Sequence, residues 1–165
     1  MSVCAQDRVA WIRVEGRANF NSSVDFKALV HGLAGKGYNR FVLDLSKCAL
    51  MDSTFLGVLS GVGLKFNNAK NGSPNGTIEL LNPNERVADL LENLGVNHLF
   101  KTVNGPELAN NCLEPVEQTP ASKDQKEVTR TCLEAHQTLM NINPNNIPKF
   151  KDVAQFLAED LKKMQ

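Results

Sequence analysis

The segment from residue 41 to residue 66 constrains the fold more than any other part of the chain. Residues 41–45 are apolar apart from Asp44, which is typical of a central strand covered on both faces. After a short connection, residues 52–54 are an aspartate, a serine and a threonine, all favourable residue types at a helix start. Apolar residues then recur at helical spacing. A buried strand followed by an amphipathic helix predicts an α/β layer.

Strand and helix patterns alternate along the first two thirds of the chain. The expected order is strand 9–14, helix 23–34, strand 41–45, helix 53–66, strand 77–81, helix 83–94 and strand 96–103. Consecutive parallel strands joined through helices use right-handed crossovers. The order therefore predicts an α/β fold with about four to five strands in a mostly parallel sheet.

The expected helices carry capping and packing signals. Ser22 stands three residues before Asp25, which resembles a capping box at the start of the first helix. In the third helix, Asn82 is in the place of the N-cap and Pro83 in the place of the first helical residue. The glycines between residues 57 and 63 lie inside the second helix, where small residues allow close helix packing more often than they cradle a phosphate.

The last third of the chain differs in composition from the rest. Residues 114–122 are polar and include two prolines, which predicts a linker after a domain formed by residues 1–113. Residues 123–165 then carry two helical stripes, with a break at residues 143–144. Neither helix can bury its stripe alone, so this helical extension must pack on the domain, on a second copy or on a partner. We expect it to pack on the domain.

Composition and motifs narrow the function. Eighteen Lys and Arg balance eighteen Asp and Glu, so no net charge favours binding to nucleic acid or a membrane surface. Four scattered cysteines and the lack of a secretion signal favour a cytoplasmic protein with free thiols. We interpret the three histidines, His31, His98 and His136, as ordinary surface or partly buried side chains. No catalytic or metal-binding motif occurs, so we expect no enzymatic activity, no metal and no cofactor.

The segment that contains Ser53 resembles a known family. Residues 44–46 read D-L-S, residues 52–54 read D-S-T and residues 56–57 add L-G, a pattern similar to the switch region of the STAS domain family. The resemblance runs from about residue 9 to residue 103 and includes a helix that ends in a Leu-Gly step. Single-domain members are bacterial anti-sigma factor antagonists. The resemblance thus implies a regulator of transcription that works by partner switching.

The resemblance also implies roles for individual residues. Ser53 matches the serine that a partner kinase phosphorylates, and Asp52 and Thr54 match its neighbours at the partner-binding surface. Phe55 replaces the glycine that usually follows, which would place a bulky ring where a partner approaches. Asn19 stands near a usual acidic position and would substitute for an aspartate contact. The implied partners are an anti-sigma factor with serine kinase activity and a metal-dependent serine phosphatase.

Two other interpretations stay open. In the first, Ser53 is only one of several residues able to cap a helix, and the C-terminal helices assemble a homodimer or a larger scaffold. In the second, a nucleotide or a lipid binds at the carboxyl ends of the strands, as open α/β sheets often allow.

Overall fold

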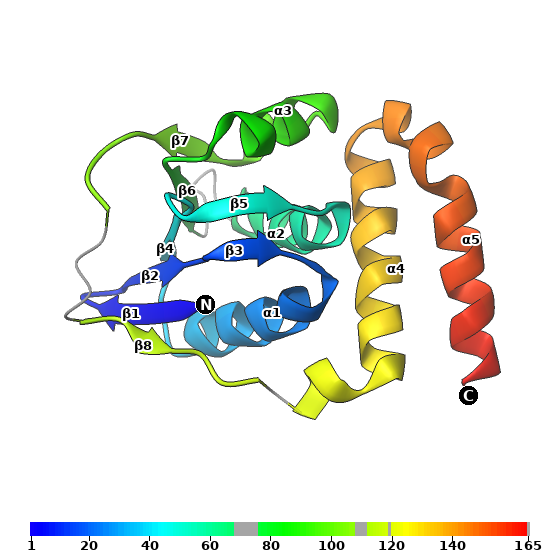
Figure 1. Cartoon of the computed structure of the whole chain (residues 1–165), viewed down its shortest axis with the longest axis horizontal. Coiled ribbons are helices and arrows are strands. Elements are labelled where there is room, and N and C mark those ends of the chain that lie inside the picture. The colour runs from blue at the N-terminus through cyan, green and yellow to red at the C-terminus, as the bar shows by residue number, and fades with distance from the viewer. Residues whose placement is uncertain (68–75, 108–111, 119, 165) are drawn as a thin grey trace.

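The main sheet has six strands within the described part of the chain, in the order β7-β6-β4-β2-β1-β8 (Figure 1). The computed structural model describes residues 1–67, 76–107, 112–118 and 120–164. The strands are β1 (Ser2–Gln6), β2 (Val9–Arg13), β4 (Arg40–Asp44), β6 (Thr77–Leu81), β7 (Lys101–Val103) and β8 (Glu114–Pro115). β2, β4, β6 and β7 pair in parallel, whereas β1 is antiparallel to both β2 and β8. The expected α/β fold with a mostly parallel sheet is confirmed.

Two strands at one edge of this sheet were absent from the predicted order. β1 and β2 are joined by Asp7 and Arg8, whose φ angles are 53° and 67°. Such a two-residue turn usually contains glycine or asparagine, and without either residue the sequence carries no hairpin signal. β8 consists of only two residues, and both belong to the expected linker. The sheet therefore continues beyond residue 113.

A second, two-stranded sheet connects the main sheet to the starts of two helices. It pairs β3 (Gly16–Ala18) in parallel with β5 (Cys48–Met51). β3 leads into α1 (Phe20–Gly35), and β5 leads into α2 (Ser53–Asn67). The backbone N–H of Asp52 donates to the carbonyl of Ala18 at 2.9 Å. The N-terminal ends of α1 and α2 consequently lie beside each other (Figure 1).

Two helices start at other residues than predicted. Asn19, not Ser22, caps α1, and Ser22 instead completes a capping box with Asn19. α3 (Glu85–Asn93) is capped by Asn84, whose side chain accepts from the N–H of Val87. Asn82, the predicted cap, has a φ of 54° and lies before the helix. Where several residues that favour caps follow one another, the sequence pattern alone does not distinguish among them.

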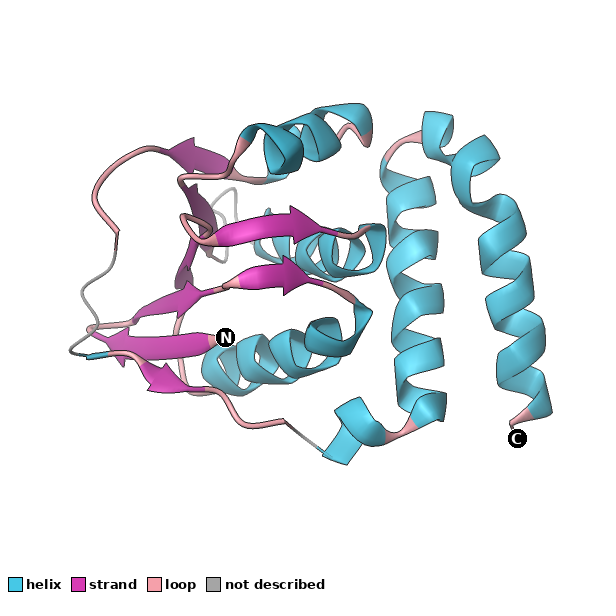
Figure 2. Ribbon diagram, viewed as in Figure 1, coloured by secondary structure: helices cyan, strands magenta, loops and turns pink. Residues whose placement is uncertain are grey.

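Two C-terminal helices form a hairpin that packs on the domain (Figures 1 and 2). α4 (Gln125–Ile142) contacts α1 and α2, and α5 (Ile147–Lys163) packs along α4. Asp124 caps α4 by accepting from the N–H of Lys126. Short 3-10 helices lie at Asn97–Leu99, Pro120–Lys123 and Pro144–Asn146. None of the helices in the described ranges combines the length and apolar character needed to cross a membrane.

The turn of the hairpin is attached to the domain by hydrogen bonds. The amide of Asn146, a fully buried residue, donates to the carbonyls of Leu94 at 3.0 Å and Leu139 at 2.9 Å. Nearby, Nζ of Lys149 donates to the carbonyl of Asn93 at 2.9 Å. One amide group thus joins the residue after α3 to the end of α4.

We predict that Asn146→Ala lowers the free energy of unfolding by about 1–3 kcal/mol, since it leaves buried carbonyls without their donor. Urea denaturation followed by circular dichroism measures this difference. Asn145→Ala is the matched control, because Asn145 is exposed on the same turn and should change stability little. Equal stability of the two variants would contradict the assigned role of Asn146.

Candidate functional site

Asp52 caps α2 and thereby determines the position of Ser53. Its Oδ1 accepts from the N–H of Phe55 at 2.8 Å, and its carbonyl accepts from the N–H of Leu56 at 3.1 Å. Ser53 is therefore the first residue of the helix, and its hydroxyl is not used as the cap. The first turn of α2 offers backbone N–H groups and the positive end of the helix dipole beside that hydroxyl.

The hydroxyl of Ser53 meets a histidine of α4. Oγ of Ser53 lies 2.9 Å from Nε2 of His136, and Nδ1 of His136 lies 2.7 Å from the carbonyl oxygen of Cys132. A carbonyl only accepts, so Nδ1 carries a proton and donates. In the neutral ring Nε2 is then the acceptor, and Ser53 donates its hydroxyl proton to it. His136 is buried, and its ring lies edge-on to Phe150 of α5 with centroids 5.0 Å apart.

Thr54 also faces α4. It is buried, and its Oγ1 donates to Sγ of Cys132 at 3.7 Å. Burial raises the pKa of the Cys132 thiol, and the nearby carboxylate of Asp52 raises it further, against an opposing effect of the Thr54 hydrogen bond. The thiol is consequently protonated near neutral pH and is a weak nucleophile there.

Gly57 allows α4 to approach α2 closely. A Cβ atom at this position would lie 2.5 Å from the carbonyl oxygen of Ala135 and 2.6 Å from its Cβ. Only glycine fits opposite Ala135 at this separation. The expectation that glycines of α2 permit close helix packing is confirmed at this position.

The ring of Phe55 does not face an approaching partner, and this expectation was wrong. Phe55 is fully buried and packs against Phe26 of α1, with ring centroids 4.9 Å apart and an angle of 36° between the rings. The residue stands in the first turn of α2, where the helix face turned toward α1 is part of the core. Phe55 therefore stabilises the contact between the two helices.

Asn19 lies at the neighbouring helix start. Its Oδ1 accepts from the N–H groups of Asn21 and Ser22, at 3.1 and 3.3 Å. Through the pairing of β3 with β5, the structure brings Asn19 and Asp52 to adjacent helix starts. Each of the two side chains caps its own helix.

Sequence reasoning missed the residues that α4 contributes. Cys132 and Ala135 belong to the stripe that was expected to pack on the domain, but nothing in that stripe indicated which helices of the domain would cover it. His136 was interpreted as an ordinary histidine. A pair 83 residues apart in the chain leaves no local pattern, so only the packing of α4 on α2 identifies it.

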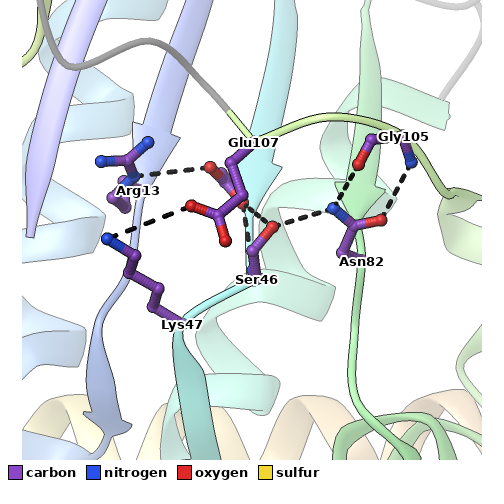
Figure 3. Close-up of polar contacts among 7 residues, drawn as sticks. Arg13, Ser46, Lys47, Asn82, Gly105 and Glu107 are labelled. Atoms are coloured by element: carbon purple, nitrogen blue, oxygen red, sulfur yellow. Dashed lines mark hydrogen bonds and ion pairs between the residues drawn. The ribbon is translucent and has the colours of Figure 1, made fainter.

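The carboxyl ends of the central strands carry a separate polar cluster (Figure 3). Arg13 and Asp44 are buried, and Nε of Arg13 lies 3.4 Å from Oδ2 of Asp44. The hydroxyl of Ser46 donates to Oδ1 of Asp44 at 2.6 Å. Asn82 donates to Ser46 at 2.9 Å and to the carbonyl of Gly105 at 2.7 Å. These groups bind one another across three strands and a loop, which favours a structural role. Among the residues that the structure describes, no three potential ligands gather to bind a metal ion.

Comparison with known proteins identifies the domain. The model of the STAS domain matches residues 1–109. The structure is similar to the crystal structure of a putative anti-sigma factor antagonist from Thermotoga maritima, at 26% identity and a TM-score of 0.54, covering 63% of this chain and 85% of that one. It also shares the fold of the anti-sigma factor antagonist SpoIIAA in its unphosphorylated form, at 16% identity and a TM-score of 0.54, with 65% and 88% coverage. No curated protein matches the chain.

We predict that Phe55→Ala destabilises the protein by about 3–5 kcal/mol, because it removes a fully buried aromatic ring and leaves a cavity. Thermal and urea denaturation measure the loss. Phe156→Ala makes the same change on α5, where the side chain is 67% exposed, and should cost far less. A small effect of Phe55→Ala would show that the ring is not a core residue.

Proposed function

The chain belongs to the STAS domain family, and on this premise we propose that it is an anti-sigma factor antagonist whose binding is switched by phosphorylation of Ser53. In the unphosphorylated state it binds an anti-sigma factor that has serine kinase activity and so releases a sigma factor. Phosphorylation ends this binding, and a metal-dependent serine phosphatase restores it. The protein acts in the bacterial cytoplasm as a regulator without enzymatic activity of its own.

The observation that carries the proposal is the division of roles between Asp52 and Ser53. Asp52 caps the helix, so the hydroxyl of Ser53 can be modified without loss of the cap. A phosphate at the first helical residue is favoured by the free N–H groups and by the helix dipole. The domain should therefore keep its fold after modification.

The negative charge of the phosphate is what would switch partner binding. A phosphoserine carries roughly −1.5 to −2 charges near neutral pH, and here it would stand directly after the carboxylate of Asp52. A partner surface that accepts a neutral hydroxyl must then desolvate a dianion or reject it. A hundredfold loss of affinity requires only about 2.7 kcal/mol. We assign Asn19, Asp52 and Thr54 to the same partner-facing surface because they flank Ser53 at the two helix starts.

A second candidate function is a scaffold that dimerises through the C-terminal helices. The observation that favours it is the exposed apolar side chains of α5: Ile147 is 45% exposed, Val153 42% and Phe156 67%. Light scattering over a range of protein concentrations tests this function. A monomer at all concentrations would exclude it.

We predict that a serine kinase partner phosphorylates Ser53 and that Ser53→Ala binds this partner constitutively. Ser53→Asp should bind at least about 100-fold more weakly, because of its added charge, and should melt close to the wild type. Phosphopeptide mapping and titration calorimetry with the purified partner measure these effects.

The neighbouring hydroxyl provides the control. Thr54→Val keeps the size of the side chain and removes the only other hydroxyl in the first turn of α2. Peptide mapping should still find the phosphate on Ser53 in this variant, whereas its partner affinity can fall because Thr54 belongs to the proposed partner-facing surface. Equal partner affinity of the wild type, Ser53→Ala and Ser53→Asp would rule out the switch.

A further inference from the structure

We propose that α4 and α5 are an internal cover on the docking groove of the domain, and that a helix of the partner must displace α4 before Ser53 is bound or phosphorylated. The groove is the surface of α1 and α2 that α4 occupies. That the displacing helix belongs to an anti-sigma factor rests on the proposed function. That a removable helix covers Ser53 is independent of the proposed function.

The geometry at Ser53 supports the cover. Phosphorylation replaces the hydroxyl proton by a phosphorus atom with three further oxygens. That proton lies in the 2.9 Å hydrogen bond between Oγ of Ser53 and Nε2 of His136. Ser53 is half-buried, and along this direction a phosphoryl group would have to displace the ring of His136 while α4 is in place. Thr54, the next residue of the expected partner surface, is buried and contacts Cys132 of α4.

The groove selects a particular kind of helix. Opposite Gly57 it admits only a small residue, and Ala135 fills this place in α4. One residue earlier, Glu134 forms an ion pair of 3.1 Å with Lys27 of α1. An acidic residue followed by a small residue thus describes what the groove binds.

Part of the contact between α4 and the groove is open to solvent. A half-open cavity of about 180 Å³ lies between α1, α2 and α4. Val58 and Val62 of α2 form part of its lining, and α4 contributes Glu134, Ala135 and the polar side chains of Thr131 and Thr138. Lys27 and Glu134 form a partly exposed ion pair between α1 and α4. A helix with larger apolar side chains at the places of Thr131 and Thr138 would bury more apolar surface against Val58 and Val62 than α4 does.

The cavity also indicates the chemistry of the competitor. Lys27, His31 and Lys65 line it on the domain side. Burial, and then the positive charges of Lys65 and Lys27, lower the pKa of His31, in agreement with a positive potential at this place. We infer that the partner inserts an amphipathic helix with an acidic and a small residue in sequence and larger apolar residues where α4 has Thr131 and Thr138.

The test uses the full-length chain and needs neither kinase nor partner. Ala135→Leu introduces a branched side chain against Gly57 and should lift α4 from the groove. The probe is a fluorescently labelled synthetic peptide of residues 123–165, which should bind to Ala135→Leu and not to the wild type. In the same variant, amide hydrogen exchange of α4 and of the first turn of α2 should accelerate at least about tenfold, while the strands keep their protection.

A matched control and a second variant complete the experiment. Gln137→Leu places the same side chain at an exposed position of α4 and should resemble the wild type. Glu134→Lys replaces the ion pair by repulsion from Lys27 and should shift exchange and peptide binding in the same direction as Ala135→Leu. This second variant keeps the proposal testable if Ala135→Leu does not fold.

The proposal is overturned if both variants lose the structure of the strands together with α4, or if α4 stays protected and neither variant binds the peptide. In either case the hairpin would be a fixed part of the core. Phosphorylation of Ser53 could still occur by another route, so this result would leave the proposed function to be judged on its own experiment.

Discussion

The parallel pairing of β3 with β5 determines where the two central helices begin. Neighbouring strands lie about 4.8 Å apart, so chains that leave them in the same direction start their helices side by side. The N–H of Asp52 binds the carbonyl of Ala18, and each strand is followed at once by a helix with its own side-chain cap. This arrangement determines that Asp52 caps α2, how Ser53 is oriented and where α4 packs.

Polar groups at the carboxyl ends of the main strands and polar groups at the starts of α1 and α2 have different roles. At the carboxyl ends of the main strands, Asp44 and Arg13 are buried together, and such a pair stabilises only when further hydrogen bonds compensate its desolvation. Ser46 supplies one of these bonds, and Asn82 in turn binds Ser46. At the helix starts, by contrast, Ser53 reaches its partner across an interface between two separate segments. The first arrangement stabilises the fold, and the second can open without breaking it.

The sequence predicted the elements with strong hydrophobic periodicity. It did not predict features that depend on contacts between residues far apart in the chain. The apolar stripes identified α2, α4 and the central strands, because burial on one face imposes a period. The start of α1 was misplaced, since Asn19 and Ser22 both favour caps. β1 was missed because its turn uses two residues in the left-handed region without glycine.

The candidate site shows the same limit. The motif around Ser53 is contiguous in the chain and was visible at once, and its phosphorylation stays a prediction. The burial of Phe55 depends on Phe26, which belongs to another helix. The hydrogen bond from Ser53 to His136 depends on how α4 packs on α2. No residue near Ser53 in the sequence indicates this packing.

Gly57 and Ala135 also bear on how freely the C-terminal helices can be exchanged. A side chain at position 57 would collide with the backbone of α4 as well as with Ala135, so no substitution in α4 alone can make room for it. A STAS domain without glycine at this position could not accept this hairpin by simple fusion. Domain and hairpin are matched parts of one protein, and a chimera that recombines them at the connecting segment inherits the constraint.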